Sequence, residues 1–233
     1  MTRIDREEIA YQIKVPVDRV VLEGEISLPL GTRGIVVFVH GSASSRHSPK
    51  NRYLAQALRQ AGLGTFLLDL LTLEEEKEDL ETGRYRFNIR LLANRLSSVV
   101  SWLKSSGDTA RLAAGYFGTG TGTAAALTVA AEHPEHVAAI VSRSGRPDMV
   151  KAALPYVKAP VLLIVGGKDL PVVAMNRDAV NELKGEKKLV IVPGATHLFE
   201  GPTALEEVAR LAVGWFTTYL NRPGSSSSSG SSE

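Results

Sequence analysis

Hydrophobic and polar positions along the chain follow two alternating periods. Short runs made almost entirely of apolar, often β-branched residues are typical of strands that are covered on both faces. Longer stretches with apolar residues three and four positions apart are typical of helices that bury one side. The predicted strands are Ile9–Val15, Val20–Leu28, Ile35–Val39, Thr65–Leu70, Leu112–Phe117, Val137–Val141, Val161–Val165 and Leu189–Val192. The predicted helices are Tyr53–Gln60, Ile89–Leu103, Thr123–Glu132, Val172–Leu183 and Leu205–Leu220, with an acidic, solvated helix at Glu74–Leu80.

The order of these elements predicts the fold class. Strands that alternate with helices form parallel sheets with right-handed crossovers, so we expect an α/β fold with a doubly wound sheet of about eight strands. Only Pro16–Arg19 separates the first two strands, and a connection of hairpin length means that the sheet begins antiparallel. Residues 1–222 are expected to form one domain. The Gly/Ser-rich segment 223–233 is expected to be a disordered tail or an added linker.

Composition narrows the class of protein. A chain of 233 residues, 44% of them hydrophobic, can bury a substantial core. The formal net charge of +2 provides no broad field for nucleic acid. No apolar run approaches the roughly 18 residues that cross a membrane, and the polar N-terminus does not resemble a signal peptide. The absence of cysteine excludes disulfides, thiolate metal sites and a cysteine nucleophile. We therefore expect a cytoplasmic protein that binds a small molecule, with no nucleic-acid or membrane partner.

Candidate chemistry gathers directly after the predicted strands, where α/β sheets bind their ligands. A glycine-flanked turn follows the fifth strand, an aspartate follows the seventh and a histidine follows the last. The segments at these strand ends are His40-Gly41-Ser42, Asp69, Gly118-Thr119-Gly120-Thr121-Gly122, Ser142-Arg143-Ser144-Gly145, Gly166-Gly167-Lys168-Asp169 and Gly194-Ala195-Thr196-His197.

In this order the segments resemble the α/β-hydrolase superfamily, and in detail its dienelactone-hydrolase-like branch. The resemblance extends from about Val20 to Leu220. It is carried by residues 38–42, 44–49, 67–72, 141–143 and 193–200. It implies an α/β-hydrolase fold and a hydrolase of ester-like or carboxylic small molecules. No long insertion stands between the sixth strand and the next helix, so we expect no large lid, and no cofactor is expected.

The resemblance also implies roles for particular residues. His197 matches the general base and Asp169 the acid that orients it. The backbone N–H groups of Ser42 and Thr121 match the two donors of the oxyanion hole. His40, Arg46, Arg143 and Ser144 are expected at the substrate pocket, with a structural role for the His40 side chain.

The residue at the nucleophile position departs from the family pattern. That position is Gly120, and glycine has no side chain with which to attack. The favoured interpretation is a lost nucleophile, natural or engineered, with little covalent turnover. The alternatives are a water activated by Asp169 and His197, or a relocated nucleophile. The residues considered for relocation are Ser42, Ser44, Thr119, Thr121 and Ser144. A ligand-binding protein on a hydrolase scaffold, or an engineered variant with a new activity, is the alternative function.

For the other polar groups, structural or surface roles are preferred over catalytic or binding roles. Asp69 is an alternative acid, but a loop hydrogen bond is the preferred interpretation. His133 and His136 are expected at the surface, and no metal site is predicted. A phosphate loop at 118–122 is disfavoured, since neither the Walker nor the dinucleotide pattern is complete. A basic cluster either recognises an anionic substrate or, as preferred, forms a solvated loop surface. Its members are Arg46, His47, Lys50, Arg52, Arg143 and Arg146.

Overall fold

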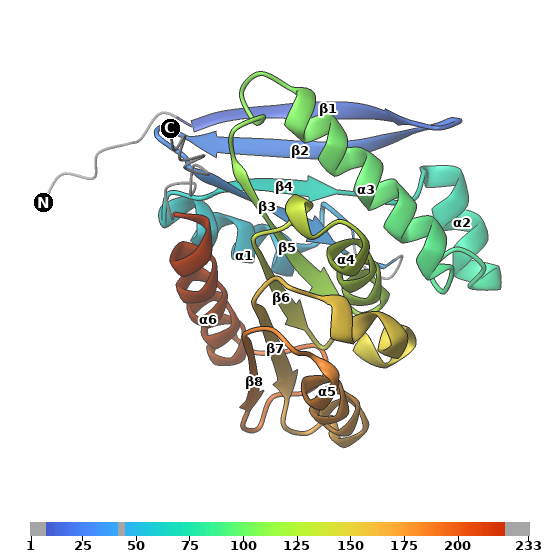
Figure 1. Ribbon diagram of the computed structural model, residues 1–233, viewed down its shortest axis with the longest axis vertical. Coiled ribbons are helices and arrows are strands. Elements are labelled where there is room, and N and C mark those ends of the chain that lie inside the picture. The colour runs from blue at the N-terminus through green and yellow to red at the C-terminus, as the bar shows by residue number, and fades with distance from the viewer. Residues whose placement is uncertain (1–7, 42–44, 222–233) are drawn as a thin grey trace, which may run out of the picture.

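The computed structural model describes residues 8–41 and 45–221 of the chain. Within these residues eight strands form one sheet in the order β1-β2-β4-β3-β5-β6-β7-β8 (Figure 1). The strands are β1 (Glu8–Val17), β2 (Val20–Pro29), β3 (Gly34–Val39), β4 (Gly64–Leu68), β5 (Ala113–Thr119), β6 (Ala139–Arg143), β7 (Val161–Gly166) and β8 (Lys187–Val192). The expected α/β-hydrolase sheet is therefore confirmed. Segment 223–233, for which a tail was expected, lies outside the described residues.

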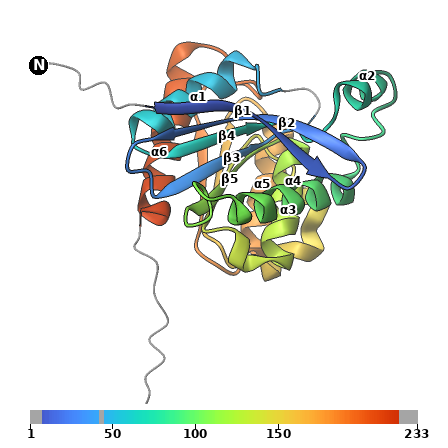
Figure 2. The same ribbon diagram turned by 90° about the horizontal axis from the view of Figure 1, so that it is seen from above.

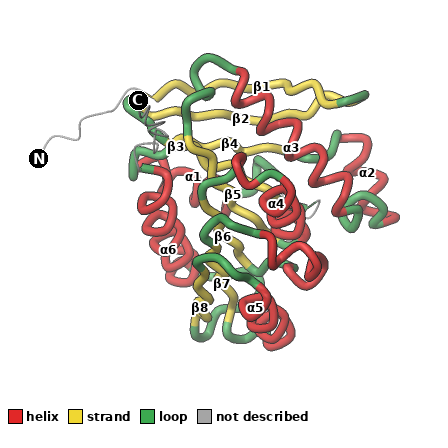
Figure 3. Tube along the Cα trace, viewed as in Figure 1, coloured by secondary structure: helices red, strands yellow, loops and turns green. Residues whose placement is uncertain are grey.

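The helices connect strands along the chain and flank the sheet in space (Figure 3). They are α1 (Pro49–Gln60), α2 (Leu73–Thr82), α3 (Ile89–Ser105), α4 (Thr121–Glu132), α5 (Leu170–Glu182) and α6 (Pro202–Leu220), with 3-10 helices η1 (Pro134–His136) and η2 (Pro147–Tyr156). The α1 and α6 helices begin about one turn earlier than the apolar period predicts. Each starts at a proline, whose fixed φ suits the first helical position. Periodicity missed η1 and η2 because they are not α-helical. None of the described helices is long and apolar enough to cross a membrane.

The sheet begins antiparallel, as the short first connection predicts. β1 pairs with β2, and β2 pairs with β4, both antiparallel. The turn between β1 and β2 contains Asp18 at φ 51°, a left-handed conformation that aspartate tolerates better than most residues. All later pairs, from β3 to β8, are parallel.

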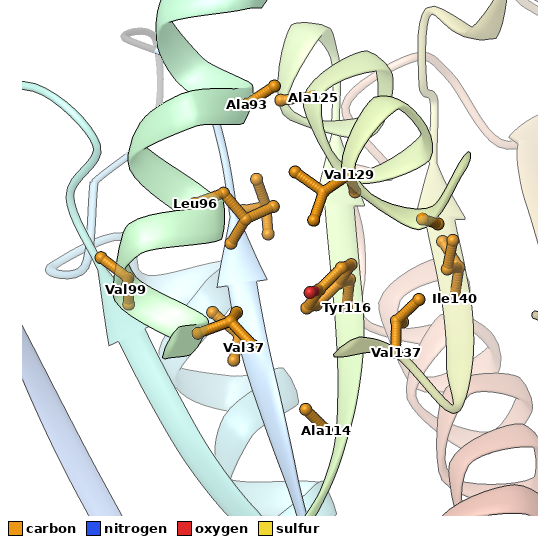
Figure 4. Packing of buried hydrophobic residues seen from close by; sticks show 14 of the residues in the cluster. Val37, Ala93, Leu96, Val99, Ala114, Tyr116, Ala125, Val129, Val137 and Ile140 are labelled. Carbon is orange, nitrogen blue, oxygen red and sulfur yellow. The ribbon is translucent and has the colours of Figure 1, made fainter. Parts of the chain in front are cut away.

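Two hydrophobic layers cover the two faces of the sheet. Successive residues of a strand point to opposite faces, so Val37 of β3 packs with α3 and α4 while Phe38 packs with α1 and α6. The α3, α4 and α5 helices lie on one face, and α1 and α6 lie on the other (Figure 2). Figure 4 shows the first layer, where Leu96 of α3 and Val129 of α4 approach Tyr116 of β5. Apolar residues on both faces explain why the strand runs show no polar alternation.

The acidic α2 helix forms as expected and fixes the loop that follows it. Its capping box is complete, since Thr72 Oγ1 accepts from the Glu75 amide and Glu75 Oε2 accepts from the Thr72 amide. Asp79 is buried and accepts hydrogen bonds from the backbone amides of Tyr85 and Arg86, at 2.6 and 2.8 Å. The Arg86 side chain is thereby held at the carboxyl edge of the sheet.

Candidate active site

The turn between β5 and α4 is shaped by glycines. Gly120 lies at φ 53° and ψ −127°, a conformation that side chains rarely adopt. A Cβ on Gly118 would lie 2.7 Å from the Thr123 Cα, and one on Gly122 would lie 2.2 Å from the Val39 carbonyl oxygen. A Cβ on Gly120, in contrast, would meet no heavy atom of the described residues within 4 Å. The turn thus excludes side chains at 118 and 122 and leaves room for one at 120.

The structure brings Asp169 and His197 together. Asp169 follows β7 and His197 follows β8, and Asp169 Oδ2 lies 2.6 Å from His197 Nδ1. Asp169 is also the N-cap of α5, where Oδ1 accepts from the Val172 amide at 3.5 Å. The carboxylate therefore caps a helix and orients an imidazole at once. Because Nδ1 faces the carboxylate, Nε2 is the ring nitrogen left for a reacting group.

Two neighbouring strand ends hold the His197 loop. The Lys168 amide donates to the Ala195 carbonyl at 3.0 Å, so the loop after β8 packs on the loop after β7. Ser144, after β6, donates its hydroxyl to the His197 carbonyl at 3.0 Å. Ser144 is buried and has φ 45°, a conformation that is costly for a residue other than glycine. Its hydroxyl is used to support His197.

A cavity of about 440 Å³ joins these parts. A larger cavity of about 800 Å³ lies between the His197 loop and α6, but neither Gly120 nor His197 lines it. The smaller cavity is therefore the candidate site. It is lined by Gly41, Ser48, Pro49, Lys50, Arg86, Thr119, Gly120, Thr121, Arg143, Ser144, His197 and Leu198.

Three cations line this cavity, and one of them has no partner among the described residues. Lys50 donates to the Leu198 carbonyl at 2.6 Å, and Arg86 donates from Nε to Asp79 at 2.8 Å. The Nη1 group of Arg143 is buried and finds no hydrogen-bond acceptor within residues 8–41 and 45–221. Burial lowers the pKa of Arg143 to about 10, so the side chain stays cationic at neutral pH. A partly buried guanidinium whose buried Nη1 group lacks an acceptor favours an anionic ligand.

Of the two predicted oxyanion-hole donors, the structure describes Thr121. Thr121 opens α4, whose first amides have no partner within the helix, and it lines the cavity. Gly41 approaches Thr121 closely, since a Cβ on Gly41 would lie 2.5 Å from the Thr121 hydroxyl oxygen. The loop after β3 therefore reaches the start of α4. Ser42 and Ser44 lie outside the described residues.

The expectation that His40 and Arg46 line the substrate pocket needs correction. His40 is buried, with Nε2 3.2 Å from Asp69, and the Arg46 guanidinium pairs with Asp69 and Glu23. Neither side chain lines the cavity beside Gly120. The physical reason is that the carboxylates of Glu23 and Asp69 both pair with the Arg46 guanidinium and hold it away from the cavity. Asp69 makes the loop contacts preferred for it and pairs with His40 and not with His197.

The other members of the basic cluster either form ion pairs away from the cavity or line it. Arg52 pairs with Glu25 at 3.0 Å, and Arg146 forms a two-bond pair with Asp148. Of the six cluster members, Lys50 and Arg143 line the cavity. Arg86 was missed, because it follows an acidic surface helix and no strand-end pattern marks it. The contact that holds it, a hydrogen bond to the buried Asp79, is visible only in the structure.

Acid should weaken the loop that follows β3. Burial pushes the pKa of Asp69 upward, but hydrogen bonds from His40 and Arg46 outweigh this and hold the pKa below its ordinary value. The contribution of the carboxylate is therefore complete above its unfolded pKa of about 4 and is lost as the pH falls through the lower folded value. We expect Asp69→Asn to lower the free energy of unfolding by about 3 kcal/mol at neutral pH.

Urea unfolding measured from neutral pH down to about pH 3 tests this expectation. The gap between the wild-type chain and Asp69→Asn should close as the pH falls below about 4. A gap of constant size across that range would show that the charge of Asp69 contributes nothing.

Comparison with known proteins agrees with the fold. The sequence model of the dienelactone hydrolase family matches residues 34–219. The crystal structure of a dienelactone hydrolase from Anabaena variabilis is 57% identical, with a TM-score of 0.89, and the match covers 91% of this chain and 99% of that one. Est1E from Butyrivibrio proteoclasticus is 14% identical with a TM-score of 0.76 over 91% of this chain and 99% of its own, which supports the fold alone.

A curated relative extends beyond the length of this chain. A Mycobacterium tuberculosis protein named "Putative phosphoribosyl transferase" is 49% identical over 215 residues, or 92% of this chain and 48% of the relative. The chain thus spans about half the length of that relative. The family match covers most of the described sheet and both loops that carry Asp169 and His197. The chain belongs to the dienelactone hydrolase family of α/β hydrolases.

Proposed function

We propose that the chain binds a small ester-like or carboxylic molecule beside Gly120 and performs little or no covalent turnover. One observation carries the proposal. The Asp169–His197 pair and Gly120 meet at the same cavity, and Gly120 offers no atom that can attack a carbonyl. The ordinary acyl-enzyme route requires a hydroxyl or thiol at that point.

The remaining groups support the chemistry of a bound water. His197 Nε2 would take a proton from a water in the space beside Gly120, while Asp169 stabilises the resulting imidazolium. The water oxygen would form a bond to the ester carbon, and the alkoxide would leave with the proton that His197 returns. The amides at the start of α4 would stabilise the tetrahedral oxyanion. Rates would be far below those of an intact triad.

One candidate replacement nucleophile is engaged elsewhere. The Ser144 hydroxyl donates to the His197 carbonyl at 3.0 Å. This contact favours a lost nucleophile over one relocated to Ser144.

A second candidate function, ligand binding without turnover, is favoured by Arg143. A partly buried guanidinium whose buried Nη1 group lacks an acceptor is an anchor for a carboxylate or phosphate group. We propose that the transferase name of the mycobacterial relative describes the part of its chain outside the match. Because a guanidinium binds phosphate as well as carboxylate, a phosphorylated sugar is tested beside a carboxylate.

Probe labelling tests the proposed function. Incubation with a fluorophosphonate and with p-nitrophenyl esters should give no stoichiometric label and no burst of product. Slow product formation that disappears in His197→Ala would identify the water route. Product formation that persists in His197→Ala would contradict it. Stoichiometric labelling of the wild-type chain would overturn the proposal.

Ligand-dependent stabilisation tests the role of Arg143. Benzoate or ribose 5-phosphate should raise the melting temperature of the wild-type chain, because a ligand that binds only the folded state stabilises it. Arg143→Met should weaken that binding by about 10- to 100-fold, since it removes the charged partner of a desolvated anion. Arg52→Met, which changes an arginine outside the cavity, should leave it unchanged. Equal binding by all three proteins would exclude Arg143 as the anchor.

A further inference from the structure

A second cluster of reactive side chains lies at the other end of β6 from Arg143. His133, Glu135 and His136 belong to a His-Pro-Glu-His segment that joins α4 to β6. His133 is the cap residue before η1, and His136 ends it. The two imidazoles lie side by side. Their rings stack with centroids 5.0 Å apart and an interplanar angle of 20°.

Three potential ligand atoms converge in this segment. Glu135 Oε1 lies 3.7 Å from His133 Nδ1 and 3.4 Å from His136 Nε2. All three atoms lie within 4.8 Å of one another. In a tetrahedral zinc site with bonds of about 2.0–2.1 Å, neighbouring ligand atoms are about 3.3 Å apart. The separations from Glu135 are therefore close to those of a site with two histidines and one carboxylate.

Exposure also suits a metal. The side chains of His133 and Glu135 are 44% and 63% exposed, which leaves the convergence point open to a metal ion and to water as a fourth ligand.

We infer that His133, Glu135 and His136 form a binding site for a divalent transition-metal ion of the zinc class. Imidazole and carboxylate together suit Zn²⁺, Ni²⁺ or Co²⁺ better than Mg²⁺ or Ca²⁺, which prefer oxygen ligands alone. The site precedes β6, whereas Gly120 follows β5, so the two lie at opposite ends of parallel neighbours. The inference is independent of the proposed function.

The positive charge of Lys104 lies beside the cluster and should weaken metal binding, so removing that charge tests the proposed site. Lys104 Nζ donates to the Glu135 carbonyl at 2.8 Å, and Arg33 and Arg111 line the adjoining cavity. The Lys104 ammonium repels a bound cation at short range. Removing its charge should therefore tighten metal binding, which an unrelated adventitious site elsewhere on the chain would not show.

Calorimetric titration of the full chain with Zn²⁺ near neutral pH tests the site. The wild-type chain should bind one equivalent, and His133→Ala and Glu135→Gln should each weaken binding by at least about tenfold. His47→Ala, which removes an exposed histidine outside the cluster, should bind as the wild type does. Lys104→Met should bind severalfold more tightly.

Two readouts keep the inference open to contradiction. Co²⁺ should give the visible absorption of a tetrahedral site in the wild-type chain and lose it in His133→Ala. Melting temperatures without metal show whether each variant is folded, and only folded variants are compared. Absence of saturable binding, or equal affinity in the wild type and in a folded His133→Ala, would overturn the inference.

Discussion

Replacement of Gly120 by serine is expected to produce a chain that a fluorophosphonate labels stoichiometrically. Turnover of p-nitrophenyl esters should rise by about 10³-fold or more, since loss of a triad nucleophile costs several orders of magnitude in rate. The gain depends on a pair that already exists, with Asp169 Oδ2 2.6 Å from His197 Nδ1. A single hydroxyl would complete the arrangement.

The space around Gly120 permits this change. A Cβ there would meet no heavy atom of the described residues within 4 Å, so the serine needs no repacking. Its backbone lies at φ 53°, which should cost a serine about 1–3 kcal/mol. The melting temperature of Gly120→Ser should therefore fall by several degrees. Strain of this kind is typical of residues that are held for reaction.

Two matched variants separate chemistry from strain. Gly120→Ala has the same backbone cost and no hydroxyl, so it should lose stability without gaining label. Gly120→Ser combined with His197→Ala retains the hydroxyl without its base and should lose most of the turnover. A folded Gly120→Ser that gains no label would mean that His197 is not placed to activate position 120.

The sheet could be predicted because its strands are apolar on both faces. The β3 run of Val36, Val37 and Phe38 distributes its side chains between two hydrophobic layers, which a continuous apolar run indicates without a structure. Helix starts were less predictable, because a first turn led by proline carries no apolar period. Pro49 and Pro202 each begin a helix ahead of its apolar stripe.

The positions of site residues could be predicted where the order of strands along the chain fixes them. They could not be predicted where they depend on which ion pair a side chain forms. Asp169 and His197 meet because both follow neighbouring parallel strands, β7 and β8, which end at the same edge. Arg46 and Arg143 look alike in the sequence, yet Arg46 turns toward Glu23 and Asp69 while Arg143 turns into the cavity. That choice depends on carboxylates from β2 and from the end of β4, which no local pattern reveals.

Gly122→Ala should be among the most damaging single-methyl changes in the chain. Its Cβ would lie 2.2 Å from the Val39 carbonyl oxygen and 2.8 Å from the His40 amide nitrogen. Both are backbone atoms at the end of β3, so no side chain can rotate away. The start of α4 must move from the sheet instead, and overpacking of this kind costs about 3 kcal/mol.

The same shift should reach the chemistry, because the start of α4 carries the turn at Gly120. In the Gly120→Ser background, Gly122→Ala should abolish most probe labelling even where the protein remains folded. Gly214→Ala is the matched control, since Gly214 lies in α6 and a methyl group added there would meet no neighbouring heavy atom of the described residues within 4 Å. An alanine in that exposed helix interior should stabilise the chain by about 0.5–1 kcal/mol. Urea unfolding should therefore show that the same added methyl group lowers the free energy of unfolding at position 122 and raises it at position 214. A methyl group cannot lie 2.2 Å from a carbonyl oxygen. If Gly122→Ala had the same free energy of unfolding as the wild type, the close approach of α4 to β3 would be contradicted.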